Sequence, residues 1–169
     1  MSTTGTAQRT VQVYRVYIKA SPQAIWDAIT RPEWTERYGY GGRVDYDLRP
    51  GGRYRAFASD EMRATGAPEI AVDGEVAESD PPHKLVQTWR MVMDDGLAAE
   101  GFTQLTHEIK ATGGGLSRLT VTHDLTGAPR LQLLLSGGQE DQGAGGGWAY
   151  VLSSLKSLLE TGDSLPWPS

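Results

Sequence analysis

The feature that most constrains this chain is an amphipathic segment near its C-terminal end, residues 147–162. Its apolar residues recur at the three- and four-residue spacing of an α-helix, and they form one stripe made of Trp148, Val151, Leu152, Leu155, Leu158 and Leu159. The opposite face is predicted to be polar and exposed, with Ser153, Ser154, Lys156, Ser157 and Glu160. Gly162 is expected to end the helix as its C-terminal cap, and Pro166 prevents a restart. Full burial of six such side chains contributes on the order of 10 kcal/mol before entropy is subtracted, so the stripe requires a covering surface.

The rest of the chain is predicted to supply that surface as a β-sheet. Alternating or β-branched and aromatic patterns predict seven strands, at residues 11–19, 43–47, 53–58, 70–76, 84–93, 102–111 and 116–125. The last two strands each have one apolar and one polar face, and 112–115 joins them as a hairpin. The expected fold is α+β, with an antiparallel sheet folded around the C-terminal helix.

Two short helices are predicted between the first and second strands. Ser21 and Pro22 have the residue types of an N-cap and a first helical position, and Pro32 opens a second helix that runs to about Arg37. Residues 59–68 and 126–147 show no periodicity and are expected to be irregular.

Composition limits the classes of function. The 169 residues favour one domain, expected over 11–162, with a flexible N-terminus at 1–10 and a tail at 163–169. There is no cysteine, which excludes disulfides and thiolate metal sites. The net charge is −5 and the basic residues are scattered, which argues against a nucleic-acid partner. The absence of a long apolar run argues against a membrane partner, so a cytoplasmic location is expected.

Several phrases of the sequence resemble a known superfamily. They are ASPQAIWDAITRPEW (20–34), DLRPGGRYR (47–55), DGEVAESDPPHKLVQTW (73–89), SRLTVTHD (117–124) and GWAYVLSSLKSLLETG (147–162). Together with the order of elements, they resemble the START and birch-pollen-allergen superfamily, and within it the group named after the activator of the heat-shock-protein-90 ATPase. The resemblance implies the helix-grip fold, in which a curved sheet wraps around a long C-terminal helix. Its members include ligand carriers, polyketide cyclases and resistance proteins, so the fold alone does not settle the function.

Aromatic and apolar side chains are expected to converge between sheet and helix. Such a set either fills the core or surrounds a ligand cavity with a few polar tips. In the second case the predicted walls are Tyr54, Trp89, Met91, Trp148 and Leu152, and the predicted mouth is Trp34 and Tyr38.

Two histidines fall on the apolar faces of the last two strands. His107 is expected to lie opposite either Val121 or His123, so the two imidazoles should be neighbours. They are candidate polar anchors or proton carriers in a cavity, or else core histidines bonded to backbone or water. No metal is expected, because His83 begins a different strand and no third ligand is placed with the pair. No cofactor motif is present either, because the GAGGG run at 143–147 lacks a phosphate-binding context.

The leucine cluster at 131–135 and the glycine-rich segment at 137–147 are interpreted as a lid over the cavity, with a disordered insertion as the alternative.

Four hypotheses of function remain open at this stage. The first is binding of a small apolar or aromatic molecule, without catalysis. The second is an enzyme of the polyketide aromatase/cyclase kind, and the third is resistance by sequestering a reactive natural product or by self-sacrifice to it. The fourth is a co-chaperone-like partner. A homodimer is possible in each.

Overall fold

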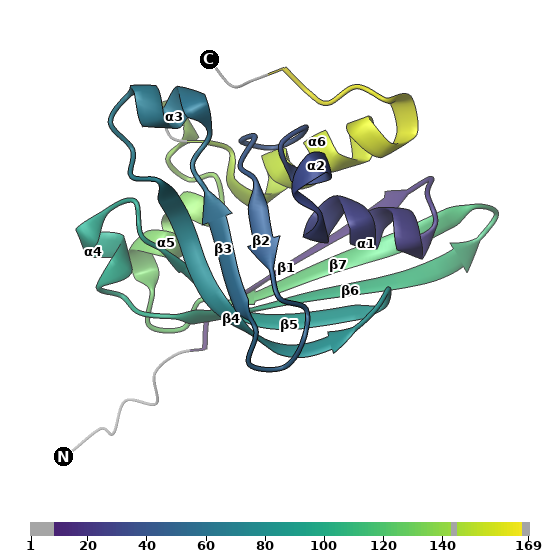
Figure 1. The fold of residues 1–169 in the computed structure, drawn as a ribbon, viewed down its shortest axis with the longest axis horizontal. Coiled ribbons are helices and arrows are strands. Elements are labelled where there is room, and N and C mark those ends of the chain that lie inside the picture. Colours follow the sequence, from purple (N-terminus) through teal and green to yellow (C-terminus); the bar gives the residue numbers. More distant parts are fainter. Residues whose placement is uncertain (1–8, 143–144, 167–169) are drawn as a thin grey trace.

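The structure is a computed structural model that describes residues 9–142 and 145–166. Seven antiparallel strands form one curved sheet in the order β1-β7-β6-β5-β4-β3-β2, and the helices α1, α2 and α6 lie on one side of it (Figure 1). The strands are β1 (Val11–Ile18), β2 (Val44–Tyr46), β3 (Arg53–Phe57), β4 (Ile70–Asp80), β5 (Lys84–Met91), β6 (Thr103–Gly113) and β7 (Leu116–Asp124). The predicted α+β helix-grip fold is confirmed. The expected flexible N-terminus falls mainly on residues 1–8, which lie outside the described residues.

The long C-terminal helix α6 (Gly147–Thr161) forms where the periodicity predicts it. It ends at Gly162, whose φ of 85° is the left-handed conformation that glycine adopts without strain. The helix contacts β1, α1 and α5. Leu152, Leu155 and Leu158 are buried against the sheet.

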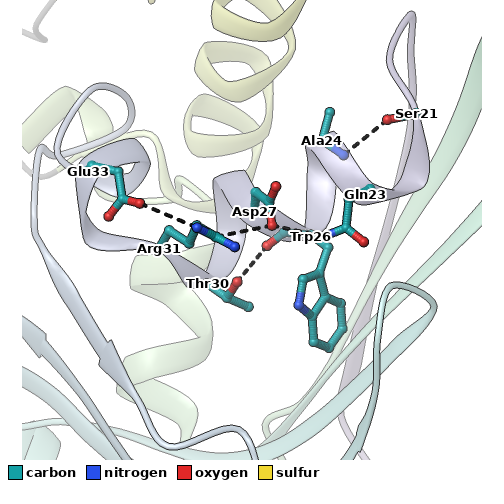
Figure 2. A network of polar contacts seen from close by, with 8 residues as sticks. All are labelled: Ser21, Gln23, Ala24, Trp26, Asp27, Thr30, Arg31 and Glu33. Carbon is teal, nitrogen blue, oxygen red and sulfur yellow. Dashed lines mark hydrogen bonds and ion pairs between the residues drawn. The ribbon is translucent and has the colours of Figure 1, made fainter.

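The short helix α1 (Pro22–Thr30) lies beside α6, and Figure 2 shows how its ends are held. Ser21 is the N-cap, because its hydroxyl accepts a hydrogen bond from the backbone N–H of Ala24. At the other end Arg31 bonds Asp27 at 3.2 Å, one turn earlier on the same helix. The helix α2 (Pro32–Thr35) follows directly, which confirms the two predicted helices.

Three short helices occupy segments that were expected to be irregular or a turn. Two of them begin at residues whose side chains cap them: Ser59 accepts from Met62 N before α3 (Asp60–Ala64), and Asp94 accepts from Leu97 N before α4 (Asp95–Ala98). The long connection at 126–147 contains α5 (Pro129–Leu135) and a 3₁₀ turn, η1 (Glu140–Gln142). Each is less than two turns long, which is too short to show a clear periodicity.

Ser154 corrects the predicted helix face. It was expected on the polar side of α6, but it is fully buried, and its hydroxyl accepts a hydrogen bond from the backbone N–H of Gly39 at 3.1 Å. The segment after α2 packs against α6 at this point, and the small hydroxyl satisfies a buried donor that an apolar side chain would leave unpaired. By contrast, Ser153 is exposed.

The buried stripe of α6 leads to a stability prediction. Leu155→Ala should lower the free energy of unfolding by roughly 2–5 kcal/mol, because it opens a cavity in the core. Ser154→Ala should cost about 1–3 kcal/mol, because it leaves the N–H of Gly39 unpaired. Ser153→Ala, on the exposed face, should change stability by less than about 0.5 kcal/mol. Urea unfolding of the three variants measures the ranking, and equal midpoints for Leu155→Ala and Ser153→Ala would contradict the packing of α6.

Candidate functional site

The β6–β7 hairpin presents its two histidines to the inside of the fold. The register pairs His107 with Val121 and Leu105 with His123, so the imidazoles are diagonal neighbours on the inner face. Both are buried, with 6% and 0% of their surfaces exposed. Of the two registers that the sequence left open, the one that places His107 opposite Val121 is observed.

A cavity of about 410 Å³ lies between the inner face of the sheet and α6. Its wall is formed by residues of β2 to β7, of the helices α1, α2, α3, α5 and α6, and of the α2–β2 connection. None of these lining residues is an aspartate, glutamate, lysine or arginine. Seven of the residues singled out in the sequence line it: Tyr38, Tyr54, Trp89, Met91, His107, Trp148 and Leu152.

Two of the residues singled out in the sequence do not line the cavity. Trp34 was expected at the mouth, but it lies half-buried on α2, where the guanidinium of Arg37 stacks over its ring at 4.9 Å. His123 lies behind the wall, between Trp89 and Trp148, with ring centroids 5.2 Å and 6.0 Å away.

His123 is held by a directed chain of hydrogen bonds. The indole N–H of Trp148 donates to its Nδ1 at 3.1 Å, and its Nε2 lies 2.7 Å from the hydroxyl of Thr103. That hydroxyl donates its own proton to the carbonyl of Trp89 at 2.8 Å, so it must accept from Nε2. The chain therefore requires the neutral tautomer with its proton on Nε2.

This chain gives His123 a supporting role. An additional proton on Nδ1 would point at the indole N–H of Trp148, and two donors cannot bond each other. Burial, reinforced by the neighbouring His107, lowers the pKa of His123 to about 3. His123 therefore stays neutral and fixes Trp148 in the cavity wall.

His107 differs from His123 because its buried Nδ1 has no hydrogen-bond partner within the described part of the chain. Its ring stands edge-on to Trp148, with centroids 6.2 Å apart. Burial lowers the pKa of His107 to about 4, so the ring is neutral near pH 7. Of the two histidines, only His107 lines the cavity.

Sequence reasoning missed several groups of this site. Tyr46 stacks on Tyr54 with ring centroids 4.5 Å apart, and its hydroxyl donates to the buried amide of Gln87 at 2.6 Å. Leu134 and Leu135 of α5 also line the cavity. The leucine spacing and Pro129 at the helix start were available as signals for α5, whereas the Tyr46–Gln87 pair depends on long-range register.

The helix α5 is fixed in place at its first turn. Both carboxylate oxygens of Glu100 accept backbone N–H groups, from Arg130 and Leu131, each at 3.0 Å. Asp94 adds an ion pair with Arg130 at 3.6 Å. Leu131 and Leu135 are buried beneath the helix. The glycine-rich run that follows falls partly on residues 143–144, outside the described residues.

Three other hollows carry charged side chains. One, of about 420 Å³, lies between β1 and α6 and includes Arg15, Lys156 and Glu160. The other two, by α2–α3 and on the outer sheet face, also contain acids and arginines. Within residues 9–142 and 145–166, no group of three histidines or carboxylates could hold a metal ion, and no helix is long and apolar enough to cross a membrane.

The curved antiparallel sheet and the long C-terminal helix packed on its inner side define a helix-grip protein. A sequence model of one family, described as Activator of Hsp90 ATPase homolog 1-like protein, matches residues 19–160. The chain therefore belongs to the Activator of Hsp90 ATPase homolog 1-like family. No curated protein matches the chain in a sequence search.

Solved structures share the fold. The Aha1 dimer from Colwellia psychrerythraea is 18% identical with a TM-score of 0.62, covering 90% of this chain and 98% of that one. CalU16 from Micromonospora echinospora is 18% identical with a TM-score of 0.61, covering 99% and 81%. DynU16, from the dynemicin biosynthetic locus, is 20% identical with a TM-score of 0.64, and 94% of this chain matches 50% of it. At these identities the likeness shows the fold alone.

The two buried histidines lead to a pH prediction. Both pKa values are lowered in the folded protein. At a pH below 6.5, the ordinary pKa of histidine, the unfolded chain therefore binds more protons than the folded chain does. The contribution of the two histidines to stability is therefore complete above about pH 6.5, and it is lost as the pH falls toward about 4 for His107 and about 3 for His123. Urea unfolding at pH 7 and pH 5 should show a smaller loss for His107→Phe than for wild type. An equal loss in the two proteins would contradict a neutral, buried His107.

Proposed function

We propose that this protein binds a small apolar or aromatic molecule in the cavity between the sheet and α6. The supporting observation is a cavity of about 410 Å³ with no aspartate, glutamate, lysine or arginine among the described residues that line it. This volume lies in the range of about 300–1,000 Å³ that is typical of small-molecule sites. Aromatic rings from three elements, Tyr54, Trp89 and Trp148, offer flat apolar contacts to such a molecule.

The geometry favours binding over proton-transfer catalysis. An acid–base enzyme needs a group that can change protonation near neutral pH at the reacting atom. Both ring nitrogens of His123 are already engaged within the protein, and burial keeps the pKa of His107 at about 4. No lining carboxylate or lysine stands beside His107 to share a proton with it.

We also propose that α5 acts as a lid of this cavity. Leu134 and Leu135 reach the cavity from a helix of seven residues, and the carboxylate of Glu100 attaches the first turn of this helix through two backbone hydrogen bonds. A helix of less than two turns belongs to the part of a fold that opens more readily than the central strands.

The cavity predicts a binding phenotype for a matched pair of variants on α6. Val151→Trp places a large ring inside the cavity and should weaken binding of naphthalene at least tenfold, measured by titration calorimetry. Ser153→Trp places the same ring on the exposed face, where it obstructs the groove between β1 and α6, and should leave naphthalene affinity unchanged. If Ser153→Trp weakens naphthalene binding and Val151→Trp does not, the binding site is the groove between β1 and α6.

The lid predicts an exchange phenotype. Glu100→Gln removes the negative charge at the start of α5 and one good acceptor, so amide exchange over 130–135 should accelerate about fivefold to thirtyfold. Saturating naphthalene should slow the same amides in the wild type. Glu108→Gln, an exposed change on β6, serves as control and should have no effect. If amide exchange in α5 changes neither in Glu100→Gln nor on addition of naphthalene, the proposal that α5 is a lid is wrong.

A further inference from the structure

We propose that the molecule bound in this cavity is uncharged and carries a hydroxyl group that pairs with the imidazole of His107. The proposal rests on the binding function proposed above and narrows its ligand to one chemical class. It follows from two properties of the wall: its lack of charge and the hydrogen bonds that its polar atoms already make.

The wall is electrically neutral near pH 7. The ionisable side chains that line it are four tyrosines and His107. Burial raises the pKa values of Tyr38, Tyr40, Tyr46 and Tyr54, so their hydroxyls keep their protons. A carboxylate or ammonium ligand would lose its hydration without gaining an opposite charge, which is a large penalty in an apolar space.

Most polar side chains of the wall are already satisfied by the protein. Tyr38 donates its hydroxyl proton to the carbonyl of Ala28 at 2.9 Å, and Tyr46 donates to Gln87. The hydroxyl of Tyr40 accepts the backbone N–H of Gly147, and the indole of Trp148 is bonded to His123. These groups form the shape of the cavity and are not free to recognise a ligand without breaking existing bonds.

His107 is the exception in the described part of the wall. It stands in the middle of β6, with Leu85 of β5 and Val121 of β7 as its strand neighbours. Only 6% of its surface is exposed. Its Nδ1 has no partner there. Burial of an imidazole without a hydrogen-bond partner costs about 1–3 kcal/mol, so a ligand group that pairs with the part of the ring that faces the cavity is favoured.

A hydroxyl is the group that fits a neutral imidazole best. The neutral ring carries one N–H donor and one nitrogen acceptor, and a hydroxyl can both donate and accept. It therefore suits a ring nitrogen in either tautomer, as a donor to an unprotonated nitrogen or as an acceptor from a protonated one. One hydroxyl on an apolar body also matches a wall whose described residues are mostly aromatic and aliphatic and include the unpartnered ring of His107.

Three probes of similar size separate the possibilities: naphthalene, 1-naphthol, and 1-naphthoate as the anion, each titrated into the intact protein at pH 7 by calorimetry. We expect 1-naphthol to bind about threefold to tenfold more tightly than naphthalene, one neutral hydrogen bond, and 1-naphthoate at least 100-fold more weakly than 1-naphthol. In His107→Phe the preference for 1-naphthol should vanish while naphthalene still binds. His107→Leu serves if the phenylalanine does not fit.

The outcomes distinguish this proposal from the binding function on which it rests. If naphthalene binds as tightly as 1-naphthol or more tightly, the hydroxyl has no partner and the His107 proposal is wrong, although the cavity still binds. If 1-naphthoate binds best, the uncharged class is wrong. If a preference for 1-naphthol persists in both His107 variants, another group recognises the hydroxyl. If no probe binds to the wild type, the proposed function itself fails.

Discussion

One helix has to cover the inner face of a seven-stranded sheet, and the rest of the structure follows from that constraint. A helix of fifteen residues is only about 22 Å long, whereas β4 and β6 each run for eleven residues. The helix α6 contacts β1, and α1 packs on β6. The cavity is the space that these helices leave open over the middle strands, and α5 adds its leucines to one side of it.

The hydrogen bond between Trp148 and His123 connects the two layers at the start of α6. It explains why two neighbouring histidines on the same inner face have different roles. Both ring nitrogens of His123 form hydrogen bonds with protein groups, and this histidine holds the indole of Trp148 in the wall. The Nδ1 of His107, by contrast, has no partner among the described residues. Both rings are kept neutral by burial. Among the described residues that line the cavity, His107 is therefore the side chain with a buried polar atom left without a partner.

The sequence predicted the seven strands, α1, α2 and α6 because period-two and period-3.6 patterns, together with serine, proline and glycine caps, report on local backbone preferences. It also placed both histidines inside, since strand alternation decides which face a residue takes. It misassigned Ser154, because a buried serine is satisfied by a distant backbone group, here Gly39, that no local pattern reveals. The position of Trp34 outside the cavity and the separate partners of the histidines depend on packing between elements in the same way.

The central claim is that an uncharged molecule occupies the space between the sheet and α6 with its polar group on His107. A crystal structure of the protein grown with 1-naphthol tests it most directly. We predict electron density for the ring system against Trp89 and Trp148, with the hydroxyl oxygen about 2.7–3.1 Å from a ring nitrogen of His107. Density for the probe in the groove between β1 and α6, with the cavity filled by side chains, would contradict the account.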